Sequence, residues 1–82
     1  MKRSRYTIVS QILDICNSGA TKTRIVYQAN LNFQIVNPYI ELLTKNGLIE
    51  SKSGRIVLYK TTDKGLKLQE NFRQMQSGLS IA

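Results

Sequence analysis

Side chains that commonly carry out catalysis are scarce in this chain of 82 residues. It has no histidine, one cysteine, and five Asp and Glu residues scattered along the sequence. An enzyme needs a nucleophile with a base, a metal cluster or a pair of carboxylates, and this inventory favours none of them. Walker and dinucleotide-binding glycine patterns are also missing. We therefore expect no enzymatic activity, no metal and no cofactor.

The sequence also has no pair of cysteines and no long apolar run, and both absences bear on where in the cell the protein is expected. A single cysteine cannot form an internal disulfide, which fits a reducing cytoplasm. No apolar run approaches the roughly 18 residues that a membrane span requires. The basic start MKRSRYTIVSQIL has neither a continuous apolar core nor a small-residue cleavage site, so it does not match a signal peptide. The expected location is the cytoplasm, without a membrane partner.

Positive charge is abundant in the chain. Twelve Lys and Arg residues against five acidic residues give a net charge of +7 and a pI near 9.9. Hydrophobic residues make up 41% of the sequence, as in an ordinary folded chain, and the length suits one small domain with a single core. The excess of cations favours a polyanionic partner such as nucleic acid, or less often an anionic membrane surface.

The first half of the chain has helical periodicity. Apolar residues recur on one broad stripe from Ile8 to Cys16, so Cys16 is expected to be a small buried residue. Thr21 is a good N-cap for a short helix over residues 22–29. Residues 30–32 then leave room only for a tight turn before a second, longer helix. This order predicts a helix-turn-helix.

Pro38 interrupts the longer helix, which Asn32 caps and Gly47 ends. Inside a helix, proline removes a backbone donor and clashes with the preceding turn. We favour one helix with a bend near Asn37, which would tilt Gln34 and the rest of the first turn. The alternative is a helix that starts at Pro38 with Asn37 as its N-cap. The proline is otherwise a tolerated substitution at a solvent-facing position.

A change of period after Gly47 indicates β-structure. Two β-rich runs flank Ser53 and Gly54, which fit a two-residue hairpin turn. We expect Val57 and Tyr59 to face the helices. A helix-turn-helix followed by a basic hairpin is the winged-helix layout.

The last segment combines a helix start with a coiled-coil spacing. Leu66 and Leu68 are expected to point into the domain. Phe72, Met75 and Leu79 continue the apolar seam and are the candidates for a homodimer interface. We therefore expect a domain over residues 1–62 and a C-terminal helix over residues 63–82 that is part core and part dimer contact.

Three stretches resemble a family of small archaeal winged-helix proteins: SRYTIVSQILDICNSGATKTRIVYQANLN, YIELLTKNGLIE and YKTTDKG. The similarity covers most of residues 4–68, and GATKTRIVYQANLN is its most specific part. Members are basic DNA-binding proteins or predicted transcriptional regulators, and some dimerise through an antiparallel coiled coil of a long C-terminal helix. Here that helix has at most about 20 residues, roughly 30 Å, so the resemblance implies a compact helix-pair dimer at most.

Basic residues gather at the chain start, at the start of the helix over residues 22–29, and in the hairpin. A helix N-terminus adds free backbone N–H groups and a positive dipole end, which attract phosphate. The alternative is a solvated basic face without a partner. The phosphate-contact candidates are Arg3, Arg5, Thr21, Lys22, Thr23, Arg24, Lys52, Arg55 and Lys60.

The helix after Asn32 is nearly neutral, in contrast to these flanks. Gln and Asn side chains can pair with adenine, and an isoleucine can touch a thymine methyl group. The same residues also suit an ordinary polar surface. The base-contact candidates at the exposed start of this helix are Gln34, Ile35, Asn37 and Pro38.

These features together predict a fold and a function. The fold class is α+β, mostly α: a winged helix-turn-helix with the order helix–helix–helix–strand–strand–helix and room for a short strand near Ala20 and Thr21. The expected function is sequence-specific binding of double-stranded DNA by a small, chromosome-associated transcriptional regulator. Two alternatives stay open, an architectural protein that coats DNA with little sequence preference and a winged helix that docks another protein.

Overall fold

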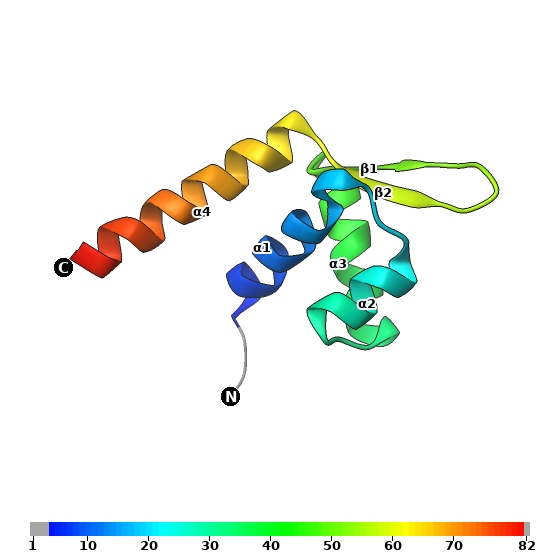
Figure 1. Cartoon of the computed structure of the whole chain (residues 1–82), viewed down its shortest axis with the longest axis horizontal. Helices are drawn as coiled ribbons and strands as arrows, with labels where there is room; N and C mark the ends of the chain where they lie inside the picture. The colour runs from blue at the N-terminus through cyan, green and yellow to red at the C-terminus, as the bar shows by residue number, and fades with distance from the viewer. Residues whose placement is uncertain (1–3, 82) are drawn as a thin grey trace.

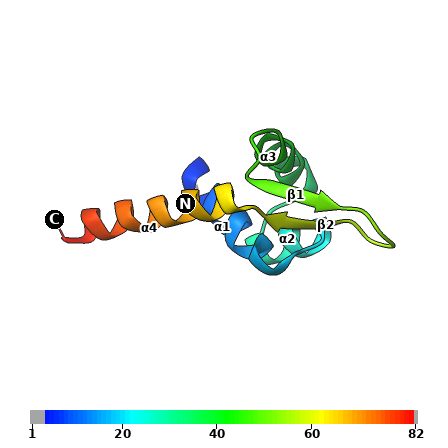
Figure 2. The same ribbon diagram turned by 90° about the horizontal axis from the view of Figure 1, so that it is seen from above.

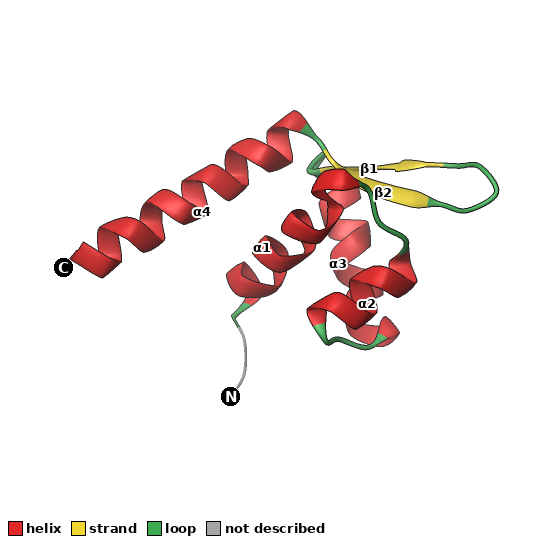
Figure 3. Ribbon diagram, viewed as in Figure 1, coloured by secondary structure: helices red, strands yellow, loops and turns green. Residues whose placement is uncertain are grey.

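The computed structural model describes residues 4–81, with side chains as far as Met75. Its elements are α1 (Arg5–Ile15), a 3₁₀ turn (Cys16–Ser18), α2 (Lys22–Ala29), α3 (Phe33–Lys45), β1 (Ile49–Lys52), β2 (Leu58–Thr61) and α4 (Asp63–Ile81). Figures 1 and 3 show the helices and the hairpin that β1 and β2 form. The predicted class, mostly helical α+β with a winged-helix layout, is confirmed.

Polar caps define the starts of α2 and α3. Thr21 Oγ1 accepts a hydrogen bond from the N–H of Arg24 at 3.2 Å, and Asn32 Oδ1 accepts one from the N–H of Ile35 at 2.9 Å. Each such cap stabilises its helix by about 1 kcal/mol. Between them Asn30 adopts the left-handed conformation, with φ of 53°, that ends α2 tightly. Both predicted caps are confirmed.

Pro38 lies inside α3, which begins at Phe33 directly after its Asn32 cap. The interpretation with Asn37 as N-cap and Pro38 as first helical residue is therefore wrong. The missing N–H of Pro38 leaves the Gln34 carbonyl without its usual partner in the helix. Gln34 and Pro38 are both exposed, so water can bond that carbonyl. A bend near Asn37 stays a prediction.

The core forms where the three N-terminal helices meet the base of the hairpin. Its buried members are Ile12, Leu13, Cys16, Ala20, Ile25, Val36, Ile40, Leu43 and Ile49. Cys16 is fully buried, as expected, and desolvation raises the pKa of its thiol to about 11. Because the thiolate is the reactive form, this cysteine is an inert core residue.

The hairpin, with its loop, is here called the wing (residues 49–61). Its register pairs Ile49 with Thr61 and Lys52 with Leu58, so the loop spans residues 53–57. A two-residue turn at Ser53 and Gly54 would instead have paired Lys52 with Arg55, and that prediction is wrong. The longer loop also leaves Val57 exposed and away from the helices, contrary to expectation. Tyr59 does pack against the core, as predicted.

A backbone bridge attaches the wing to the helix-turn-helix. Ala20 N–H donates to the Tyr59 carbonyl at 2.9 Å, and Tyr59 N–H donates to the Ala20 carbonyl at 2.8 Å. The extra strand anticipated near Ala20 and Thr21 is thus a single bridge at Ala20. Buried Thr61 adds a third link, since its hydroxyl donates to the Leu13 carbonyl at 2.6 Å.

Helix α4 packs on the domain through its first half. Gly65 and Gln69 are buried, and Leu68 is partly buried against the core. Leu66 is 46% exposed, so the expectation that it points inward is wrong. Figures 1 and 2 show α4 running away from the domain on one side and the wing projecting on the other, which gives the molecule its extents of 47 × 29 × 19 Å.

Gly65 permits the close approach of α4 to the segment between α3 and β1. A Cβ at this position would collide with the Leu48 carbonyl oxygen and lie 2.6 Å from Thr61 Cγ2. We predict that Gly65→Ala lowers the free energy of unfolding by about 1–3 kcal/mol, because overpacking outweighs the helix propensity of alanine. Urea denaturation measures the change.

Gly54→Ala is the matched control for this substitution. The nearest atom to a Cβ there, the Ile56 carbonyl oxygen, is 3.7 Å away, so stability should change little. Equal stability of the Gly65→Ala protein and the wild type would contradict the proposed close packing.

Candidate nucleic-acid interface

The start of α2 presents a phosphate-binding arrangement. Thr21 caps Arg24, and Ile25 N–H bonds back to the Thr21 carbonyl, so the N–H groups of Lys22 and Thr23 find no acceptor among the described residues. Thr23 and Arg24 are exposed, and Lys22 is partly exposed. Free donors, the positive dipole end and two cations therefore converge at one helix terminus.

Helix α3 turns the predicted base-contact side chains to solvent. Gln34, Asn37 and Pro38 are exposed and Ile35 is 42% exposed, while the buried side of α3 carries Val36 and residues further along. The helical period places Gln34 and Pro38 opposite Val36, and Asn37 and Ile35 on the two flanks. We call the exposed side with these four candidates the reading face.

One flank of α3 meets the wing in a shallow hollow. It is lined by Ile40, Glu41, Thr44, Lys45, Ser51 and Tyr59. Glu41 and Lys45 continue the line of Asn37 along the helix, and sequence reasoning did not include them among the site residues. The signal was available, because positions four apart share one face of a helix. The reading face thus extends toward the wing through Glu41 and Lys45, whose charges are opposite.

The other flank of α3 meets the start of α1. Arg5 lines a hollow there with Pro38, Tyr39 and Leu42. Arg5 therefore lies beside the reading face, on the side away from the wing. Arg3, predicted with it, lies outside the described residues.

The wing carries the remaining predicted phosphate contacts. Lys52, Arg55 and Lys60 are all exposed. In the observed register Lys60 lies opposite Glu50, so its charge is partly balanced by a cross-strand carboxylate. Arg55 lies in the loop and has no such neighbour in the register. Of the three, Arg55 is the cation best placed to meet a phosphate beyond the end of the hairpin.

The structure thus arranges cations around a nearly neutral helix face. The start of α2, the wing and Arg5 contribute the positive charge, and α3 contributes amide and apolar groups. Among the described residues no group of three or more His, Cys, Asp or Glu could hold a metal ion. None of the described helices has both the length and the apolarity of a membrane span.

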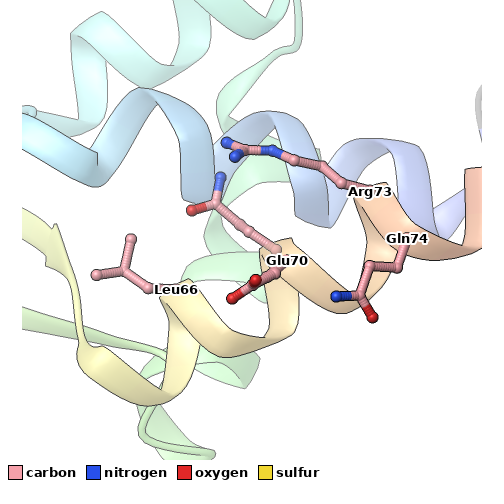
Figure 4. Close-up of a pocket in the computed structure, with 5 residues that line it drawn as sticks. Leu66, Glu70, Arg73 and Gln74 are labelled. Carbon is pink, nitrogen blue, oxygen red and sulfur yellow. The ribbon is translucent and has the colours of Figure 1, made fainter. Parts of the chain in front are cut away.

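A separate polar hollow lies along α4, away from these elements. Leu66, Glu70, Arg73 and Gln74 line it (Figure 4), together with Gln69. Gln69 is 4% exposed, and its Oε1 has no hydrogen-bond partner among the described residues. A buried acceptor that lacks a donor costs about 1–3 kcal/mol.

Three helices, a hairpin bridged to the segment before α2, and a following helix define a winged helix-turn-helix protein. The chain belongs to the winged helix-turn-helix family, whose sequence model matches residues 2–79. An uncharacterized protein of Methanocaldococcus jannaschii is 33% identical over 75 residues, which cover 90% of this chain and 74% of that protein.

Solved structures show the same fold. Sso10a-2, a DNA-binding protein from Sulfolobus solfataricus, is 28% identical, with a TM-score of 0.82 over 95% of this chain and 86% of its own. Lactococcus lactis ZitR in complex with DNA is 18% identical, with a TM-score of 0.73 over 98% of this chain and 58% of its own. At that identity the likeness to ZitR concerns the fold alone.

Pro38 lowers the stability of α3, because it lacks the N–H that would bond the Gln34 carbonyl. We predict that Pro38→Ala keeps the fold and raises the free energy of unfolding by about 1–3 kcal/mol, because it restores the bond to the Gln34 carbonyl. Asn37→Ala, a neighbouring exposed change that adds no donor, should alter stability much less. Urea denaturation compares the two, and destabilisation by Pro38→Ala would contradict the account of Pro38 as an interior helix residue.

Proposed function

We propose that this protein binds double-stranded DNA and acts as a small, sequence-specific transcriptional regulator in the cytoplasm, on the chromosome. The observation that carries the proposal is the neutral reading face of α3 framed by cations on both flanks. A single-signed surface would neutralise phosphates without reading bases, whereas this arrangement separates the two tasks.

The phosphate contacts come from the framing elements. The free N–H groups of Lys22 and Thr23 with the Arg24 guanidinium hold one strand of the backbone, and Arg55 in the wing holds another segment. Arg5 neutralises charge beside the start of α3. These contacts fix the orientation of the protein on the duplex but carry no sequence information.

The base contacts come from α3 in the major groove. Gln34 and Asn37 offer amide groups that suit adenine, and Glu41 offers a carboxylate that can accept a hydrogen bond from cytosine N4. Ile35 is exposed enough to touch a thymine methyl group. Pro38 presents no donor, so it shapes the face rather than bonding a base.

The comparisons support this proposal at the level of DNA binding. Sso10a-2, which is 28% identical to this chain, is described as a DNA-binding protein. An architectural role with little sequence preference would use the same phosphate contacts without the amides. The ratio of affinities for a selected duplex and a random duplex separates the two, since a regulator binds its site about 10³-fold tighter or more.

The affinity for DNA should depend steeply on salt. If six phosphates are neutralised, the logarithm of affinity falls with the logarithm of salt concentration with a slope near −5. Arg55→Ala should weaken binding to all duplexes alike and make the slope shallower by about one unit. Fluorescence anisotropy on a random duplex at several salt concentrations measures both.

Lys67→Ala removes an exposed cation from α4, outside the proposed interface, and should leave the slope unchanged. A wild-type slope shallower than about −2 would contradict the assignment of these cations to phosphates.

We propose further that two copies associate through α4. Met75 is 62% exposed on the seam predicted for a dimer. Phe72 is partly buried because its ring stacks edge-on against Tyr6, with centroids 5.6 Å apart. The side chain of Leu79 lies outside the described residues. A two-fold partner would cover Met75 and present two copies of α3 to a palindromic site.

Met75→Glu should therefore yield a monomer with unchanged helical content and much weaker DNA binding. Gln74→Glu adds the same charge on another side of α4 and should leave the assembly intact. Light scattering gives the molar mass of each protein. A wild-type mass of one 9.3 kDa chain at concentrations of about 100 μM would contradict the dimer.

A further inference from the structure

The tip of the wing carries an unusual apolar run. Ile56 is 60% exposed, Val57 44% and Leu58 37%, and these residues are consecutive. Elsewhere in the described residues, large exposed apolar side chains do not follow one another in this way. A single exposed isoleucine needs no explanation, but three consecutive exposed apolar residues in a folded surface usually have a function.

The run cannot be covered by the chain's own core. Figures 1 and 2 both show the loop end of the hairpin at the opposite end of the molecule from the C-terminal end of α4. The register places residues 53–57 beyond the last strand pair, so no second strand or helix flanks them. No strand or helix among residues 4–81 covers Ile56, which leaves it available to a partner.

Charge decides between the candidate partners. Arg55 directly precedes the run, and Lys52 is paired with Leu58 at the last strand pair before the loop, so two cations adjoin the apolar tip. The wing also adjoins the reading face through the hollow that Lys45 and Ser51 share. A surface that is apolar at its point, cationic around it and continuous with the proposed DNA interface suits a nucleic acid better than an apolar protein face.

We propose that Ile56 enters the minor groove of DNA and wedges between base pairs, with Arg55 on the adjacent phosphates. This inference rests on the proposed DNA binding and adds a deformation of the duplex to it. Apolar side chains that insert in this way unstack one base step and kink the duplex toward the major groove. The steps that yield most easily are TA and CA/TG, so the wing would add sequence preference without hydrogen bonds to bases.

The test uses the full chain and a duplex of about 25 base pairs with repeated TA steps, long enough for the kink to bring its ends together. One version carries a donor and an acceptor dye at its two ends, and another carries 2-aminopurine at TA steps. Binding of the wild type should raise both energy transfer and 2-aminopurine fluorescence. Ile56→Ala should abolish most of both signals and weaken binding roughly tenfold to a hundredfold.

The salt slope distinguishes this wedge from a phosphate contact. Ile56 releases no counterions, so Ile56→Ala should leave the slope at the wild-type value. Leu66→Ala is the matched control, because Leu66 is also an exposed aliphatic residue but lies on α4. It should leave energy transfer, fluorescence and affinity unchanged, and circular dichroism checks that both variants are folded.

Several results would overturn the wedge. One is a wild-type complex in which neither energy transfer nor 2-aminopurine fluorescence rises, and another is an Ile56→Ala complex in which both still rise. A third is a lower molar mass of the Ile56→Ala protein than of the wild type in the absence of DNA, which would assign the run to a protein contact. If the wild type forms no complex with any duplex, the proposed function itself fails. That result is distinguishable from failure of the wedge alone, in which a complex forms but its DNA stays straight.

Discussion

The two backbone hydrogen bonds between Ala20 and Tyr59 hold the two halves of the interface in one geometry. Ala20 directly precedes the Thr21 cap of α2, and Tyr59 lies in β2 of the wing. The bridge therefore connects the start of α2, where we propose phosphate contacts, to the cationic hairpin within a few residues. Buried Ile49 and the Thr61 bond to the Leu13 carbonyl anchor the base of the wing as well, and the bridge adds to them a fixed position for β2, since a two-stranded hairpin is only marginally stable by itself. Pre-organisation of this kind lowers the entropy lost when a surface binds its partner.

Around that bridge, charged and neutral side chains lie on different elements. Cations lie on α1, α2 and the wing, while the exposed side of α3 is neutral or balanced, with Glu41 followed by Lys45. Pro38 adds no charge to this exposed side. It leaves the Gln34 carbonyl without a helical partner, but both residues lie at the surface, where water can bond that carbonyl. The wing adds an apolar tip beyond its cations. In the proposed complex this division would let charge attract DNA and let groups with little or no charge discriminate between bases.

Local signals in the sequence predicted much of this fold. The caps Thr21 and Asn32, the burial of Cys16 and the position of the wing all follow from a few neighbouring residues. The misses involve long-range contacts. The Lys52–Leu58 register depends on the bridge of Tyr59 to Ala20, which a turn preference at Ser53 and Gly54 cannot reveal. Gly65 has a low helix propensity in the sequence, and only the fold shows that it leaves room for the Leu48 carbonyl. Glu41 and Lys45 follow Asn37 at four-residue spacing, so their side of α3 was predictable, but the contact of that side with the wing was not.

The most direct test of the central claim is an amide chemical-shift map of the isotope-labelled wild-type protein during titration with a random and then a selected duplex. The account predicts that the largest shifts fall at the start of α2, along the exposed side of α3 and in the wing loop, with the shifts on α3 greater for the selected duplex. Shifts confined to α4 and α1, or no shifts at low salt, would contradict DNA binding through the winged helix.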